Sequence, residues 1–253
     1  MAQLFLNNLL QSKSLSELEN ACQQVAACYD FEHFIYAAIY PTSFIEPQII
    51  ILNGYPLEWR THYQTQNYLA VDPVVKHCAS SVIPLNWKNI WPILEPDSEE
   101  LKLMDEARDA GLKSGVTMPI HSPQTSLAML SLASHTSLRK SDKQIDQVLP
   151  VLGLFSVYLH ETIKQLLFRT DKQQALHIPE LSNRERDCLL WAAEGKTSEE
   201  TSDRMKISKN TVIFHLKNAS AKLGTTNKIQ AVVRAITYGL IQPAHIEINS
   251  HLL

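Results

Sequence analysis

The first two thirds of the chain alternate between stretches with the apolar spacing of helices and short runs with the composition of strands. Apolar residues recur at helical spacing over residues 4–28, which predicts a helix. Residues 34–40 are aromatic and β-branched and stop at Pro41, which predicts a strand. On the same criteria, further strands are expected over residues 48–52, 115–121 and 127–133, and further helices over residues 56–66, 98–110 and from Ser141 to about residue 168.

This order of elements, with a polar turn over residues 122–126 joining two of the strands, predicts an α+β fold. We expect a mainly antiparallel sheet between two helical layers, an α/β/α sandwich. Residues 170–180 are polar, include Pro179 and have no apolar period. We therefore interpret them as a linker between one domain over residues 1–169 and a second over residues 181–253.

The second domain carries the start and stop signals of four short helices. Two capping boxes and two further caps mark the helix starts, and glycines follow the first, third and fourth helices. The second and third helices have the spacing of a helix-turn-helix, in which the third enters the major groove of DNA. The start signals are Ser182 with Glu185, Thr197 with Glu200, Ser208, and Asn227.

The third helix of this domain has one apolar and one polar face. Its apolar face must pack on the other helices and holds Val212, His215, Leu216, Ala219 and Leu223. The other face offers amides and ammonium groups, which suit base edges and phosphates. A solvated charged face on an interaction bundle is the alternative interpretation. The candidate DNA-contacting residues are Thr197, Lys209, Asn210, Thr211, Ile213, Lys217, Asn218 and Lys222.

Charge is distributed unevenly between the two predicted domains. The whole chain has a formal net charge of −3, which argues weakly against nucleic acid. Residues 181–240, however, hold ten basic and six acidic residues, a net charge of +4, against −7 for the remainder. A positive module on a negative body is what phosphate binding by one end of the chain requires.

The order of residues in the second domain resembles the LuxR-type helix-turn-helix over nearly all of residues 181–241. The resemblance implies DNA binding. Two departures stand out: Thr201–Ser202 replaces a usual Ile-Ala pair, and Ile213 occupies a position that is often polar or basic, where an apolar group suits a thymine methyl. The matching segments are residues 181–185 and 191–197, Ile207–Ser208, Thr211–Val212, Phe214–His215 and Lys222–Leu223–Gly224.

A second resemblance covers most of residues 1–165. This part of the chain is similar to the autoinducer-binding domain of LuxR-type quorum-sensing regulators, and it precedes the helix-turn-helix as expected for that family. The residues that carry it are Tyr55–Pro56, Trp59, Tyr63, Asp72–Pro73, Pro84, Trp87, Gly111–Leu112 and Gly115–Val116–Thr117–Met118–Pro119.

This resemblance implies an acyl-homoserine lactone as ligand and assigns the residues that bind it. Trp59 would donate to the lactone carbonyl and Asp72 would accept from the amide N–H. Such pairing matters because an unpaired buried polar group costs about 1–3 kcal/mol. Tyr55 and Ser131 would donate to the amide carbonyl. The remaining expected contacts are Tyr63 and Trp87 as walls, Arg60 toward a 3-oxo group, Thr117 beside the lactone, and Tyr36, Ala38, Val75, Leu112 and Met129 along the tail.

The residues taken singly have plainer interpretations, and other functions compete with ligand sensing. The aromatic residues suit an ordinary core, and Asp72 before Pro73 suits a helix cap. A LuxR-type regulator that binds another small molecule, or none, is the main alternative. A phosphorylation-controlled receiver needs an acidic cluster after an early strand and a later Lys at a strand end, and the sequence shows neither. An enzyme is the least favoured class, because no G-x-S-x-G, phosphate loop or His-x-x-x-His pair is present.

Composition and cysteine usage complete the expectations. With 45% apolar and 19% charged residues, the chain has material for packed cores. No apolar window approaches about 18 residues, so no membrane partner is expected, and the four cysteines form no C-x-x-C pair, which favours a reducing cytoplasm. No cofactor or metal is expected. The expected partners are a palindromic promoter DNA, a small-molecule autoinducer and a second copy of the chain as a homodimer, with RNA polymerase as a further candidate.

Overall fold

The computed structural model describes residues 2–40, 47–122, 127–169 and 179–242, and the chain divides into two units, Met1–Ala175 and Leu176–Leu253. Residues 170–178 of the expected linker, Pro41 and most of the expected turn over residues 122–126 lie outside the described residues. The linker and its boundaries therefore stay a prediction.

A five-stranded antiparallel sheet forms the centre of the first unit. Its strand order is β2-β1-β5-β4-β3. The four strands that the sequence predicts are all present, whereas β3 has two residues and is too short to show a period. The strands are β1 (His33–Tyr40), β2 (Gln48–Asn53), β3 (Leu85–Asn86), β4 (Ser114–Ile120) and β5 (Leu127–Ser134).

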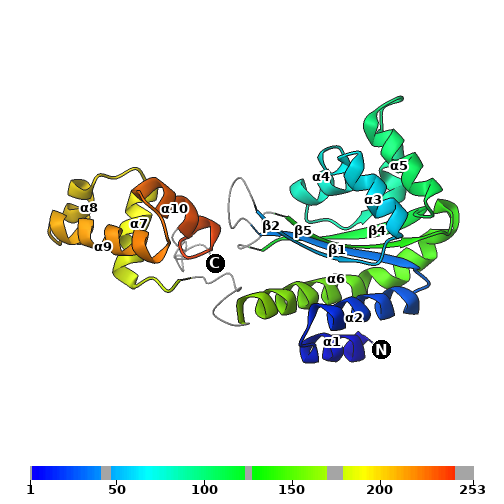
Figure 1. Ribbon diagram of the computed structural model, residues 1–253, viewed down its shortest axis with the longest axis horizontal. Coiled ribbons are helices and arrows are strands. Elements are labelled where there is room, and N and C mark those ends of the chain that lie inside the picture. The colour runs from blue at the N-terminus through cyan, green and yellow to red at the C-terminus, as the bar shows by residue number, and fades with distance from the viewer. Residues whose placement is uncertain (1, 41–46, 123–126, 170–178, 243–253) are drawn as a thin grey trace, which may run out of the picture. The chain divides into compact units, whose positions relative to one another are not determined.

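Helices cover both faces of this sheet, as Figure 1 shows, so the predicted α/β/α sandwich is confirmed. One layer holds α1 (Ala2–Gln11), α2 (Leu15–Cys28) and α6 (Leu138–Arg169). The other layer holds α3 (Leu57–Thr65), α4 (Pro73–Ser80) and α5 (Glu99–Asp109), with the short 3-10 helices η1 (Tyr68–Ala70), η2 (Trp87–Asn89) and η3 (Trp91–Ile93) between them.

Two helix predictions need correction. Residues 4–28 form two helices and not one, because Ser14 caps α2 by accepting a hydrogen bond from the Glu17 amide at 3.2 Å. The long helix α6 begins at Leu138, one turn before the predicted Ser141. The Ser141 hydroxyl donates to the Leu138 carbonyl at 3.0 Å inside that first turn, so this serine does not act as the cap.

Strand β1 separates the two helical layers by the alternation of its side chains. Phe34, Tyr36, Ala38 and Tyr40 are fully buried. The Tyr36 hydroxyl lies 2.8 Å from Nδ1 of His160 on α6, so these even-numbered positions face the α6 layer. The odd-numbered positions must then face α3, α4 and α5, because successive side chains of a strand point to opposite faces.

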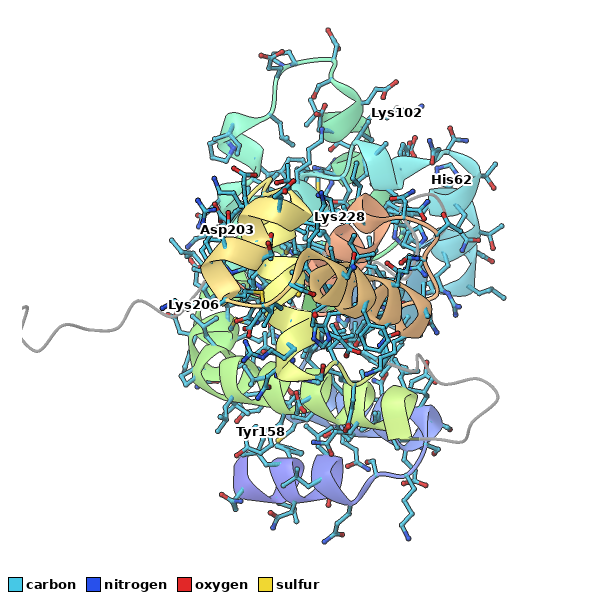
Figure 2. All side chains as sticks on the ribbon, turned by 90° about the vertical axis from the view of Figure 1, so that its left-hand side faces the viewer. His62, Lys102, Tyr158, Asp203, Lys206 and Lys228 are labelled. Atoms are coloured by element: carbon cyan, nitrogen blue, oxygen red, sulfur yellow. The ribbon has the colours of Figure 1, made fainter. Side chains whose placement is uncertain are left out.

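The second unit consists of four helices, as predicted: α7 (Asn183–Ala193), α8 (Ser198–Met205), α9 (Lys209–Lys222) and α10 (Lys228–Thr237). Both predicted capping boxes form, with reciprocal bonds between Ser182 and Glu185 and between Thr197 and Glu200. Lys206 takes the left-handed backbone conformation, φ 54°, and ends α8 before the turn into α9 (Figure 2). The core of this unit includes Leu189, Ala219, Leu223, Ala231 and Ala235.

Candidate functional site

A cavity of about 350 Å³ lies between the sheet and the layer of α3, α4 and α5. Its size lies at the lower end of small-molecule sites in proteins. Its walls come from the odd-numbered side of β1, from β2 and β5, and from the inward sides of α3, α4 and α5.

Among the described residues, no helix is long and apolar enough to cross a bilayer and no three metal-ligating side chains cluster.

Asp72 places a buried carboxylate in the cavity wall. Its Oδ1 accepts hydrogen bonds from the amides of Val74 at 2.7 Å and Val75 at 3.3 Å, which caps α4. Its Oδ2 accepts from the Tyr63 hydroxyl at 2.8 Å. Burial raises the pKa of the Asp72 carboxyl above its usual range, while the hydrogen bonds from Tyr63 and the two amides oppose that rise. One carboxylate therefore serves as helix cap and as cavity surface.

A chain of hydroxyls lies beside this carboxylate. The Trp87 indole N–H donates to Oγ1 of Thr117 at 2.9 Å, and Thr117 Oγ1 lies 2.8 Å from Oγ of Ser131. Burial raises the pKa of Tyr55, nearby Asp72 adds to the rise, and Ser131 opposes it through a hydrogen bond. Tyr55, Trp87 and Ser131 all line the cavity, so its polar end combines one carboxylate with several hydroxyls.

Trp59 brings a further donor to the wall. Its side chain is buried, yet within the described ranges its indole N–H meets no hydrogen-bond acceptor of the chain. Arg60 and Gln64, one turn apart on α3, also line the cavity and extend its polar lining. An unpaired N–H at a cavity wall is available to a ligand.

The sheet side of the cavity is apolar. Ile35, Ala37 and Ile39 of β1 line it together with Leu127 and Met129 of β5. Part of this lining remains open to solvent: the exposed fractions are 48% for both Ile49 and Ile51 on β2, and 47% for Leu69 on η1. The cavity thus has a buried polar end and an apolar wall that reaches the surface.

The second unit exposes a polar face on α9, opposite its buried Val212 and Ala219. Lys209, Asn210 and Lys217 are exposed on this helix. The Phe214 ring is 59% exposed and was not foreseen as a surface residue. Among the other expected DNA contacts, Thr197 is exposed and Thr211, Ile213 and Asn218 are partly buried.

Two of the expected cations on this face already have acidic partners. The Lys222 ammonium lies 2.8 Å from Oε2 of Glu185, and the Lys209 ammonium lies 3.0 Å from Oε2 of Glu199. Burial would raise the pKa of Glu185, but the hydrogen bonds from Lys222 and Ser182 outweigh it and lower the pKa. Since Glu185 is only 4% exposed, its pair with Lys222 is structural.

The sequence matches two family models in the same order as the two units. Residues 14–163 match the autoinducer binding domain, and residues 179–235 match the bacterial regulatory proteins of the luxR family. The chain belongs to the LuxR family of autoinducer-binding transcription regulators. Both resemblances that the sequence suggested are confirmed.

Relatives of this LuxR-family chain are similar along nearly their whole length. The transcriptional activator LuxR of Aliivibrio fischeri is 32% identical over 245 residues, which cover 93% of this chain and 92% of the relative. AnoR of Acinetobacter nosocomialis is 34% identical over 236 residues, covering 93% and 97%. These relatives are transcriptional activators and not enzymes.

Solved structures of one regulator share the fold. Escherichia coli SdiA matches with a TM-score of 0.72 and 27% identity, covering 96% of this chain and 98% of that one. SdiA in complex with octanoyl-rac-glycerol matches with a TM-score of 0.70 and 28% identity, covering 94% of each chain.

Ten of the thirteen ligand residues that the resemblance suggested for this LuxR-family chain lie together in the cavity wall. Two expectations are wrong: Tyr36 and Ala38 face the α6 layer and not the cavity. The sequence does not reveal which set of β1 side chains faces the cavity, because every residue from Phe34 to Tyr40 is apolar or aromatic. Thr117 is not in the wall either and lies behind Trp87 and Ser131. The ten residues are Tyr55, Trp59, Arg60, Tyr63, Asp72, Val75, Trp87, Leu112, Met129 and Ser131.

Several wall residues escaped the sequence reasoning. Those on the sheet were missed because the sequence pattern of a strand does not show which of its two faces lines a cavity. Those on α5 share the apolar side of a predicted amphipathic helix, which gives no sign of a cavity beyond it. The missed residues are Ile35, Ala37, Ile39, Ile49, Ile51, Asn53, Gln64, Asn67, Leu69, Val74, Leu103, Met104, Ala107 and Leu127.

The packing of the Trp87 ring should require glycine at position 115. A Cβ at this position would lie 2.7 Å from the Leu132 carbonyl oxygen and 2.7 Å from Trp87 Cδ2. We expect Gly115→Ala to lower the free energy of unfolding by about 1–3 kcal/mol and to shift the tryptophan fluorescence, because the ring must move. The control Gly153→Ala places its Cβ 3.4 Å from Met118 and should be neutral or stabilising. Equal unfolding energies for the two variants would contradict the packing argument.

Lys222 should matter for stability. We expect Lys222→Ala to lower the free energy of unfolding of the second unit by about 1–3 kcal/mol, because the buried Glu185 carboxylate loses its charged partner. Chemical denaturation followed by circular dichroism measures this. Lys217→Ala is the matched control, since within the described ranges Lys217 forms no ion pair. If the control loses as much stability as Lys222→Ala, the ion pair is not the cause.

Proposed function

We propose that this LuxR-family regulator binds an N-acyl-homoserine lactone in the cavity of its first unit, and that the ligand controls DNA binding by a homodimer. The observation that carries the proposal is the pairing of an acceptor and a donor on one cavity wall: the Asp72 carboxylate and the Trp59 indole N–H. A lactone ligand has an amide N–H and a ring carbonyl, which need such partners when they are buried.

The remaining polar atoms of the ligand have partners in the same wall. In this assignment Asp72 Oδ2 accepts from the amide N–H, next to its bond from Tyr63. Tyr55 and Ser131 donate to the amide carbonyl, and Trp59 donates to the lactone carbonyl. Trp87 packs against the head group, held by its own bond to Thr117. Arg60 is the candidate contact for a substituent at the third carbon of the chain.

The acyl chain would lie along the apolar wall of the sheet. Ile35, Ala37 and Met129 line this path, and Val75 and Leu112 add to it from the helical side. Each buried methylene group contributes about 0.8 kcal/mol, so affinity should depend strongly on chain length. Because Ile49, Ile51 and Leu69 are half exposed, part of the apolar wall reaches the surface, and we expect the cavity to accept medium or long chains.

An acylglycerol is the second candidate ligand, because the related regulator SdiA has been solved in complex with octanoyl-rac-glycerol. The hydroxyls of such a ligand can donate to Asp72, and its ester carbonyl can accept from Tyr55 or Ser131. It has no amide N–H and no lactone ring. A direct comparison of the two ligand classes therefore separates the candidates.

DNA binding is assigned to α9, with Lys209, Asn210 and Lys217 toward bases and phosphates and Thr197 at the start of α8 toward a phosphate. Exposed apolar pairs on two other helices support a homodimer: Leu154 and Val157 on α6, and Ile229 and Ile236 on α10. A two-fold dimer would place two α9 helices on a palindromic site.

A lactone should stabilise the protein. We expect N-octanoyl-homoserine lactone at about 100 times its dissociation constant to add about 2.7 kcal/mol to the free energy of unfolding, which a thermal shift measures. Homologues from butanoyl to tetradecanoyl should give an optimum of chain length. Asp72→Asn should reduce the shift at the optimal length, because its amide donates where a carboxylate oxygen accepts.

Lys88 and Asp142 offer a control for this experiment, because they form an exposed ion pair outside the cavity wall. Asp142→Asn should leave the shift unchanged. Stabilisation by octanoylglycerol and by no lactone would select the second candidate ligand. Stabilisation by neither class would refute ligand control through this cavity.

DNA binding should be specific, salt-dependent and dimeric. Sites selected from a random duplex pool with the full chain and its lactone should be palindromic and should bind two copies in analytical ultracentrifugation. Asn210→Ala should weaken binding to such a site by about 5- to 150-fold, the equivalent of about 1–3 kcal/mol for a lost base contact. Asp203→Ala on α8 should bind as the wild type does. Selection of sites without symmetry would argue against the dimer.

A further inference from the structure

Glu106 on α5 binds one side chain of α3 and one of η1, and both of these side chains lie next to the Trp59 indole. Its Oε2 accepts a hydrogen bond from the Tyr68 hydroxyl at 2.6 Å and lies 2.6 Å from Nε2 of His62. Lys102 stands farther off, 3.9 Å from Oε1. Figure 2 labels His62 and Lys102 on the helical layer away from Tyr158 of α6. A single carboxylate therefore joins α3, η1 and α5, all of which contribute to the cavity wall.

The two residues that Glu106 holds are ring neighbours of Trp59. The ring centroid of Trp59 lies 5.9 Å from that of His62 and 6.4 Å from that of Tyr68. His62 and Tyr68 also meet each other edge to face at 5.8 Å. Because Glu106 binds both side chains at once, neither ring can move away from Trp59 without breaking a hydrogen bond, and together they limit the movement of the indole.

Orientation matters for the indole more than for an apolar wall residue. A hydrogen bond weakens steeply when the angle at the hydrogen falls below about 120°, so a rotated indole loses its bond to a carbonyl before it loses its packing. Hydrogen bonds from Tyr68 and, to a lesser extent, His62 keep the pKa of Glu106 below its usual range. The Glu106 carboxylate that holds these two side chains is therefore charged at neutral pH.

We propose that Glu106 is a positioning residue for the ligand's head group: through His62 and Tyr68 it orients the Trp59 indole N–H toward the ring carbonyl of the lactone. This inference rests on the proposed function. It adds that recognition of the ring ester depends on a residue that touches the ligand nowhere, since Glu106 is not in the cavity wall.

The test compares two ligands that differ at one group. N-octanoyl-homoserine lactone and N-octanoyl cyclopentylamide share the amide, the chain and a five-membered ring, but only the lactone has a ring carbonyl. We expect the wild-type full chain to bind the lactone roughly two- to tenfold more tightly, as one net hydrogen bond allows. Glu106→Leu should reduce this preference to less than about twofold. A general loosening of the wall would weaken both ligands alike and leave the ratio unchanged.

Glu100 supplies the matched control. It lies on the same helix with a similarly exposed side chain, 31% against 32%, and pairs with Lys76 at 2.7 Å, away from the Trp59 rings. Glu100→Leu should keep the wild-type preference. Glu106→Gln should restore most of it, because an amide oxygen still accepts from Tyr68 and His62. In a Trp59→Phe background, Glu106→Leu should produce no further change in the ratio.

The outcomes separate this inference from the proposed function. If neither octanoyl ligand binds the wild type, lactone binding itself is wrong. If the lactone binds but Glu106→Leu keeps the preference, or Glu100→Leu loses it equally, the positioning role is wrong and lactone binding stands. A change in the ratio that persists without the Trp59 indole would show that Glu106 acts through another group, and would also overturn the inference.

Discussion

The buried carboxylate of Asp72 is the constraint on which the first unit depends. Burial disfavours its charge, and the chain compensates with two amides at the start of α4 and with the Tyr63 hydroxyl. That arrangement fixes the start of α4 against α3, and it leaves the carboxylate in the wall of a cavity. A further donor from a ligand would strengthen the same compensation, so helix capping and the proposed ligand recognition would draw on one group. This explains why a polar residue stands where an ordinary core would hold an apolar one.

Strand β1 connects the cavity to the helices on the other side of the sheet. One set of its side chains forms the cavity floor, while the alternate set packs on the helices behind the sheet, where Tyr36 meets His160 of α6. Because the two sets of side chains point to opposite faces, the cavity is separated from α6 by one layer of backbone. α6 is also the last element before the DNA-binding unit along the chain. Ordering of the cavity and ordering of α6 are therefore expected to be coupled through β1.

Local signals explain how much of this was predictable from the sequence. Capping boxes such as Ser182 with Glu185 act within four residues, and all four helices of the second unit were found from such signals. Strands were found by composition, but their faces were not, because Tyr36 and Ile35 both suit a buried strand position and only the packing of distant helices decides between them. The break at Ser14 was missed because apolar spacing continues across it. Ten wall residues came from the family resemblance, whereas Ile49 and Leu103 carry no local sign of a cavity.

The charges of the second unit bear on the proposed dimer. Of its cations on and near α9, Lys222 is tied to Glu185 and Lys209 to Glu199, and the Lys228 ammonium donates to the Lys196 carbonyl. The charges of Lys209 and Lys222 are thus partly offset within the unit, and affinity for DNA grows with the number of phosphates that cations neutralise. Two linked copies would bind more tightly than a single copy, because the second binds at a high effective concentration. If ligand burial favours the dimer, it thereby controls DNA binding without any change in the contacts that each α9 makes.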